Sequence, residues 1–188
     1  MKPAVFLDRD GTVIDLVPYL TDPQQVSIVD GGLAALQRLH AKGFALVVVT
    51  NQSAIGRGLL DEEGLAEVHQ VMNAQLAQGG IRLAGLYHCP LTPTSSDPTI
   101  IEHPDRKPGP GMILRAAQEL GIAVGESFMI GDSISDLLAG RNAGCRANIL
   151  VRTGHGVRAE ETHADLLLPT DHCVDDLAAA ADLILADL

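Results

Sequence analysis

Short apolar runs alternate with amphipathic stretches along most of the chain. The runs are continuous rather than alternating, as is typical of strands that are buried on both faces of a sheet. The stretches between them carry apolar residues at helical spacing. We expect strands at Ala4–Leu7, Phe44–Val49, Leu83–His88, Ser127–Ile130, Ala147–Val151 and Asp165–Leu168. We expect helices at Gly32–Lys42, Asp61–Gln78, Gly111–Leu120, Ser135–Ala143 and Val174–Leu188.

This alternation predicts the α/β class, as a Rossmann-like three-layer sandwich with a mostly parallel central sheet. The segments between the strands are too short for a large cap domain, so we expect a single domain over residues 1–188. One segment departs from the alternation of strands and helices, because residues 89–111 contain six prolines. A loop of this length inside a compact domain is typically functional or mobile.

The composition and net charge of the chain indicate a globular protein and exclude some classes of partner. The chain has 188 residues, of which 46% are hydrophobic and only 3% aromatic, which predicts a globular core of aliphatic side chains. Its net charge of −11 argues against nucleic acid and anionic membranes as partners. Three widely spaced cysteines suggest no disulfide framework. No signal-peptide core or apolar run of about 18 residues is present, so we expect a cytoplasmic protein without a membrane partner.

Two aspartates follow the first predicted strand. Asp8 and Asp10 are two residues apart, so in a strand their side chains point to the same face. Two carboxylates that close repel each other unless a cation or a shared proton relieves them, and a divalent cation is the obvious neutraliser. Thr50 and Asn51 follow the second strand and Asp132 follows the fourth. Because ligands bind parallel sheets beyond the carboxyl ends of the strands, these groups predict one shared site.

Four motifs occur in a fixed order along the chain. They are Asp8-x-Asp10-x-Thr12, Thr50-Asn51-Gln52-Ser53, Arg106-Lys107-Pro108 and Gly131-Asp132-Ser133-x-x-Asp136. Over essentially the whole chain this pattern resembles the haloacid dehalogenase superfamily of phosphotransferases. Within it, the chain looks like the group of histidinol phosphatases and D-glycero-D-manno-heptose 1,7-bisphosphate phosphatases. The segments Val47–Gly58 and Leu150–Gly154 favour the heptose branch.

The resemblance implies a Mg²⁺-dependent phosphatase that hydrolyses a small sugar phosphate through an aspartyl-phosphate. The 7-phosphate of the heptose bisphosphate is the implied target, which would supply activated heptose for lipopolysaccharide or related glycans. In this reading Asp8 is the nucleophile and Asp10 the proton donor and acceptor. Lys107 supplies positive charge where the phosphoryl group becomes more negative, and Thr50 and Asn51 donate hydrogen bonds to the phosphoryl oxygens.

The metal and substrate ligands follow in the same way. Asp8 and Asp132 would hold Mg²⁺ in an all-oxygen shell, and the resemblance implies that Asp10 contributes its backbone carbonyl. Asp136, one helical turn further on, could anchor a metal-bound water or Lys107. Arg106, and as a second candidate Arg57, could hold another phosphate. The remaining substrate-binding candidates are Tyr19, Gln52, Ser53 and Ser133.

The proline-rich loop departs from the pattern of the resembled group. There the loop commonly carries Cys-x-His and Cys-x-Cys, four ligands of a structural zinc. Here the corresponding positions are Cys89-Pro90-Leu91 and His103-Pro104-Asp105, so most of the ligand set is missing. We therefore expect no structural Zn²⁺, with the prolines stiffening the loop instead.

Two other functions remain open from the sequence. A histidinol-phosphate phosphatase would use the same catalytic residues with a pocket suited to an amine and an imidazole. A non-catalytic protein that binds a phosphorylated ligand could use the same fold, although the intact nucleophile, acid, lysine and metal aspartate argue against it. We expect a monomer, because Gly11–Asp22 and the proline-rich loop can enclose a small substrate without a partner.

Overall fold

The computed structural model describes residues 1–162, 164–167 and 171–186. All strands of this part of the chain belong to one parallel sheet with the order β3-β2-β1-β4-β5-β6. The strands are β1 (Ala4–Leu7), β2 (Ala45–Asn51), β3 (Gly85–Cys89), β4 (Phe128–Gly131), β5 (Ala147–Val151) and β6 (Asp171–Val174). The sheet is parallel throughout, which confirms the predicted α/β class.

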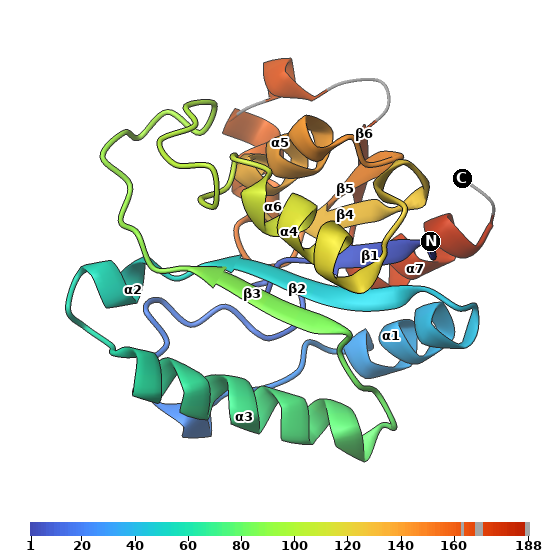
Figure 1. Ribbon diagram of the computed structural model, residues 1–188, viewed down its shortest axis with the longest axis horizontal. Helices are drawn as coiled ribbons and strands as arrows, with labels where there is room; N and C mark the ends of the chain where they lie inside the picture. Colours follow the sequence, from blue (N-terminus) through green and yellow to red (C-terminus); the bar gives the residue numbers. More distant parts are fainter. Residues whose placement is uncertain (163, 168–170, 187–188) are drawn as a thin grey trace.

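Helices cover both faces of the sheet (Figure 1). One face packs against α1 (Gly32–Ala41), α3 (Glu62–Gln78) and α7 (Leu177–Leu185), and the other against α4 (Gly111–Leu120) and α5 (Ile134–Ala143). Successive side chains of β1 alternate between the two cores: Val5 and Leu7 join the first, whereas Ala4 and Phe6 join the second. The predicted three-layer sandwich is therefore confirmed. Among the described helices, none is both long and apolar enough to cross a membrane.

Short elements connect this framework. Two short α-helices, α2 (Ser53–Gly56) and α6 (Gly156–Thr162), follow β2 and β5, and the sequence reading missed both. The 3₁₀ turns are η1 (Pro23–Gln25), η2 (Val124–Glu126) and η3 (Ala164–Leu166). All of the longer elements before residue 152 lie within two residues of their predicted ends.

The C-terminal region differs from the prediction. The strand expected at Asp165–Leu168 is wrong, because Ala164–Leu166 form η3 and Leu168 lies outside the described residues. The sixth strand is instead Asp171–Val174, which is half-buried and forms one edge of the sheet as far as the structure describes it. The last helix was expected from Val174, but it begins after Asp176, whose carboxylate accepts a hydrogen bond from the Ala179 N–H at 2.8 Å.

Ser127 joins the start of β1 to the turn before β4. It is fully buried; its hydroxyl accepts a hydrogen bond from the Ala4 N–H at 2.9 Å and donates one to the Ala123 carbonyl at 2.7 Å. Replacing it by alanine leaves a buried N–H and a carbonyl without these partners. We expect Ser127→Ala to lower the free energy of unfolding by about 1–3 kcal/mol, measured by urea denaturation.

The exposed Ser96 provides the control for this measurement. Ser96→Ala should change the unfolding free energy by less than about 0.5 kcal/mol. Equal stability of the Ser127→Ala variant and the unmodified protein would contradict the structural role assigned to the hydroxyl.

Candidate active site

A cavity of about 440 Å³ opens at the carboxyl ends of the central strands. In Figure 1 this is the side of the sheet from which the proline-rich loop, residues 89–111, rises. The predicted catalytic and metal-binding residues Asp8, Asp10, Lys107 and Asp132 line the cavity. Of the predicted substrate-binding residues, the cavity is lined by Tyr19, Asn51, Gln52, Ser53 and Ser133.

Lys107 lies at the centre of the charged groups. Its buried ammonium is 2.5 Å from Asp8 Oδ1 and 2.6 Å from Asp136 Oδ1, and it donates a hydrogen bond to the Val49 carbonyl at 2.8 Å. Burial alone would lower the pKa of Lys107, but the carboxylates of Asp136 and Asp8 outweigh it and raise the pKa above its usual range. Lys107 is therefore a permanent cation in the floor of the cavity.

Asp136 positions this lysine. It is the third residue of α5, and its Oδ2 accepts hydrogen bonds from the Ser133 N–H at 3.0 Å and the Ser133 hydroxyl at 2.6 Å. The bond from the Ser133 N–H is one half of a capping box at the start of the helix, and the Ser133 side chain completes it by accepting from the Asp136 N–H. The sequence left open whether Asp136 anchors a metal-bound water or Lys107, and the structure places it against Lys107.

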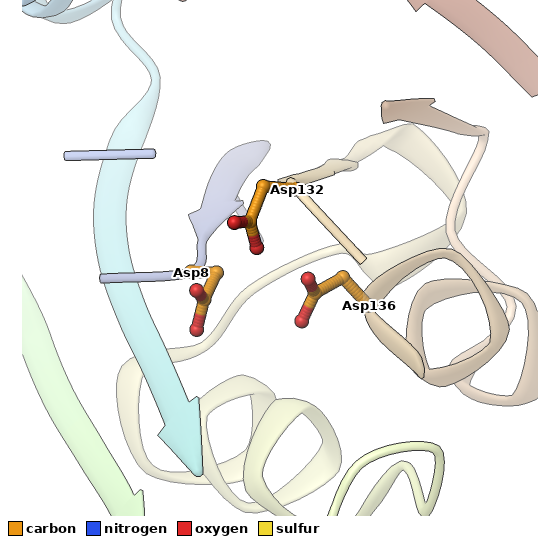
Figure 2. A group of neighbouring side chains, drawn as sticks. All are labelled: Asp8, Asp132 and Asp136. Atoms are coloured by element: carbon orange, nitrogen blue, oxygen red, sulfur yellow. The ribbon is translucent and has the colours of Figure 1, made fainter. Parts of the chain in front are cut away.

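Negative charge exceeds positive charge in this cluster. Oxygens of Asp8, Asp132 and Asp136 lie within 4.8 Å of one another, and Figure 2 shows the three side chains gathered around one space. Burial raises the pKa of Asp8 to about 7; Asp136 and Asp10 add to this shift and Lys107 opposes it. Burial, followed by the charges of Asp8 and Asp136, raises the pKa of Asp132 to about 8. The carboxylates therefore favour binding of a proton or a cation.

Carboxylate oxygens without hydrogen-bond partners show where a cation would bind. Asp8 Oδ1 contacts Lys107, and Asp132 Oδ2 accepts a hydrogen bond from the His155 N–H at 2.7 Å. Within the described part of the chain, neither Asp8 Oδ2 nor Asp132 Oδ1 has a hydrogen-bond partner. Two oxygens without hydrogen-bond partners, on buried carboxyl groups of raised pKa, suit a hard divalent ion such as Mg²⁺. Asp8 and Asp132 thus have the chemistry of metal ligands.

Two glycines leave room for Asp132. Gly11 (φ 79°) and Gly154 (φ 55°) both have backbone conformations that side chains disfavour. A Cβ at either position would collide with Asp132 Oδ2. The sequence reading gave neither glycine a role, although each occurs directly beside a motif threonine, Thr12 or Thr153.

Asp10 belongs to a second hydrogen-bonded network. Arg9, only 1% exposed, donates to Asp10 Oδ1 at 3.0 Å and to Asp10 Oδ2 at 3.2 Å. Gln52 donates to Asp10 Oδ2 at 2.9 Å and to Thr50 Oγ1 at 2.8 Å, and its own Oε1 accepts from Arg9 at 2.9 Å. The sequence analysis gave Arg9 no role. The only indication in the sequence is that this arginine stands between the two motif aspartates, Asp8 and Asp10.

Two motif residues lie where predicted but make different contacts. Asn51 was expected to donate to a phosphoryl group, but its amide pairs with the Lys107 backbone, accepting from N–H and donating to the carbonyl, both at 3.1 Å. Its side chain therefore fixes the segment that carries the lysine. Thr50 is buried beneath the cavity and is not among its lining residues, although its hydroxyl proton has no acceptor among the described residues.

The two predicted phosphate-binding arginines lie outside the cavity lining. Arg106 donates to the Leu91 carbonyl at 2.6 Å, and its Nε is 3.7 Å from Glu102 Oε2. Arg57 is exposed, and its guanidinium carbon is 5.6 Å from the ring centre of Tyr19, which does line the cavity. Arg57 thus reaches the rim through Tyr19, whereas Arg106 stabilises the proline-rich loop.

The positions considered for zinc have other contacts. Cys89 is buried at the end of β3, and His103 Nδ1 accepts a hydrogen bond from the Asp105 N–H at 3.1 Å. Asp105 in turn pairs with Arg115 at 2.9 Å. The absence of a structural zinc stays a prediction.

Comparisons with known proteins agree with this site. A family described as HAD-hydrolase-like matches residues 105–180. The chain is 42% identical over 154 residues to D-glycero-beta-D-manno-heptose-1,7-bisphosphate 7-phosphatase of Pasteurella multocida, covering 82% of this chain and 84% of that one. It is 44% identical over 168 residues to the enzyme of the same name from Yersinia pestis, covering 88% and 89%.

A solved structure extends the likeness to the whole fold. The D,D-heptose 1,7-bisphosphate phosphatase of B. bronchiseptica, complexed with magnesium and phosphate, superposes with a TM-score of 0.86 at 33% identity and covers 100% of both chains. The chain therefore belongs to the haloacid dehalogenase superfamily, in the group of the heptose bisphosphate phosphatases, and is a phosphoric monoester hydrolase.

Proposed function

We propose that this enzyme uses Mg²⁺ to hydrolyse the 7-phosphate of D-glycero-D-manno-heptose 1,7-bisphosphate through an aspartyl-phosphate on Asp8. The observation that carries the proposal is the contact of Lys107 with Asp8 beside Asp132, three buried groups brought together from separate parts of the chain. The names of the relatives support the substrate, and the magnesium and phosphate of the B. bronchiseptica structure support the cofactor and the phosphoryl site.

Asp8 performs the first half-reaction. A carboxylate oxygen of Asp8 forms a bond to phosphorus as the bond from phosphorus to the sugar oxygen breaks. Asp10, in its protonated form, donates a proton to the departing alkoxide. Lys107 stabilises the charge on the phosphoryl oxygens. Its ammonium binds the carbonyl of Val49, the residue before Thr50, and we assign the Thr50 hydroxyl an assisting role.

Asp10 performs the complementary proton transfer in the second half-reaction. It removes a proton from water, whose oxygen attacks phosphorus as the bond to Asp8 breaks, which releases phosphate and regenerates both carboxyl groups. The hydrogen bonds from Arg9 and Gln52 hold the Asp10 carboxyl group in one orientation for this transfer. Asp10 therefore acts in both half-reactions, as the protonated acid in the first and as the carboxylate base in the second.

Asp8 and Asp132 would hold the metal, with the Asp10 backbone carbonyl as a third oxygen. When bound, Mg²⁺ supplies positive charge that lowers the repulsion between the nucleophile and the phosphoryl group. The raised pKa values of Asp8 and Asp132 and their two free oxygens fit this role. Asp136 remains with Lys107.

The cavity is suited to a small ligand. Its volume of about 440 Å³ is in the range of small-molecule sites. Tyr19, Ser53 and Ser133 line it around the catalytic groups and are placed to contact the sugar. Arg57 at the rim can approach the second phosphate of an extended bisphosphate, and Arg106 contributes by fixing the adjacent loop.

Removing the nucleophile tests the covalent step. We expect Asp8→Asn to lower kcat by at least about 1,000-fold, measured as phosphate release, because the amide cannot attack phosphorus. The variant should still fold, since it removes one carboxylate from a cluster of like charges. The exposed Asp15 offers a matched control, and Asp15→Asn should retain full turnover. Turnover by Asp8→Asn above one-tenth of normal, roughly 1.4 kcal/mol, would exclude the covalent mechanism.

The stability of the metal-free protein should depend on pH through the two proposed metal ligands, Asp8 and Asp132. The pKa values of Asp8 and Asp132, about 7 and 8, exceed the value of about 3.9 in an unfolded chain. The folded metal-free protein therefore binds more protons than the unfolded chain above about pH 4, and its stability falls as the pH rises through 7 and 8. We expect a lower Tm at about pH 8.5 than at about pH 6 after chelation.

Added Mg²⁺ should reverse this trend, because it binds the deprotonated carboxylates. The rise in Tm on adding Mg²⁺ should be larger at the higher pH, and chelation should abolish phosphate release until Mg²⁺ is restored. The same scans on Asp132→Asn provide the control, since this variant should lose most of the Mg²⁺ response. A Tm shift that is equal at both pH values would contradict the assignment of these ligands.

Substrate preference tests the finer proposal. We expect kcat/KM for the heptose bisphosphate to exceed that for histidinol phosphate and fructose 1,6-bisphosphate by more than tenfold, about 1.4 kcal/mol. A preference for histidinol phosphate would assign the enzyme to the other branch of the group. Tight binding of the bisphosphate without turnover of any ester would indicate a binding protein.

A further inference from the structure

We propose that His69 is a positioning residue for catalysis, which holds Arg9 and through it the carboxylate of Asp10. His69 lies on α3 and does not line the cavity, so it does not touch a bound substrate. The proposal rests on the acid and base role of Asp10 proposed above.

Arg9 is the link between the helix and the acid. Its guanidinium is buried and permanently charged, so each of its donors requires an acceptor inside the protein. Two sides of the guanidinium bind Asp10 and Gln52, which line the cavity. The third nitrogen, Nη1, is 3.0 Å from His69 Nε2. His69 is thus the acceptor on the side away from the substrate.

The contact fixes the tautomer of the imidazole. Because arginine only donates, His69 Nε2 must be the acceptor and the ring must be neutral, with its proton on Nδ1. Burial, followed by the charges of Arg9 and His88, lowers the pKa of His69 to about 3. The ring therefore remains an acceptor under all conditions in which the enzyme would be assayed.

The helix and the neighbouring strand hold the ring in place. α3 packs into the core through Leu65, Val68 and Met72, which lie on its buried side. The ring centre of His88, on β3, lies 6.0 Å from that of His69, and His88 Nε2 is 3.0 Å from Glu62 Oε2. Without His69 the buried guanidinium would lack one acceptor and would turn towards another. Asp10 would then lose the fixed direction that proton transfer to the leaving group requires.

The test separates proton donation from the rest of catalysis. An alkyl phosphate ester, such as the sugar phosphate, needs a proton on its leaving alkoxide, whereas p-nitrophenyl phosphate releases a stable anion. We expect His69→Phe, which keeps a ring without the acceptor, to lower kcat for the sugar phosphate about 10- to 100-fold with little change in KM. Its kcat for p-nitrophenyl phosphate should fall by less than about threefold.

Two further variants distinguish positioning from a structural effect. His69→Gln retains an acceptor oxygen and should recover most of the sugar-phosphate activity. The exposed His40 supplies the control, and His40→Gln should leave both substrates unaffected. Circular dichroism and Tm must show that each variant folds, and His69→Met replaces the phenylalanine variant if that one does not.

The outcomes also distinguish this proposal from the proposed acid and base role of Asp10, on which it rests. If Asp10→Asn alone changes the ratio of the two activities and His69→Phe lowers both equally, Asp10 is the acid but His69 does not position it. If Asp10→Asn leaves the ratio unchanged, the proposed role of Asp10 fails and this inference with it. If His69 acts through Asp10, adding His69→Phe to Asp10→Asn should cost no further activity on the sugar phosphate. A full additional loss in the double variant would overturn the proposal.

Discussion

The rest of the site depends on the concentration of negative charge at the ends of β1 and β4. These strands are neighbours in the sheet, so Asp8 and Asp132 emerge side by side, and Asp136 returns to them from the first turn of α5. The described cluster contains one cation in direct contact, Lys107, against three carboxylates. Burial, to which the neighbouring carboxylates add, raises the pKa of Asp8 and Asp132, so the cluster favours binding of a proton or a cation.

Lys107 can serve this cluster only because a loop is held in one position. The lysine lies within the proline-rich loop, and the Asn51 amide binds its backbone N–H and carbonyl, both at 3.1 Å. Earlier in the loop, Glu102 accepts hydrogen bonds from the N–H groups of Thr94 and Ser95, both at 2.7 Å, and Arg106 binds the Leu91 carbonyl. Side-chain contacts with the backbone thus order a segment that has little regular secondary structure.

The sequence predicted what depends on local pattern and on the geometry of parallel strands. Continuous apolar runs identified the first five strands, and carboxylates at their ends identified Asp8, Asp10 and Asp132. The edge strand β6 was missed because it is short and half-buried and begins with two polar residues, so it forms no continuous apolar run. Arg9 and His69 were missed for another reason. Their pairing joins residues 60 positions apart, and helical periodicity gives only the face of α3, not the partner that a histidine meets.

The active site therefore combines two buried cations with different tasks. Lys107 contacts Asp8, whereas Arg9 donates hydrogen bonds to Asp10. Gln52 extends the Asp10 network to the end of β2, because its amide contacts Arg9, Asp10 and Thr50 at once. Asp8 and Asp10 are two residues apart in the chain and would repel each other if both were left charged and unpaired. Separate cationic partners, anchored in different parts of the fold, lower this repulsion and hold each carboxylate in its own position, which supports the different roles proposed for the two residues.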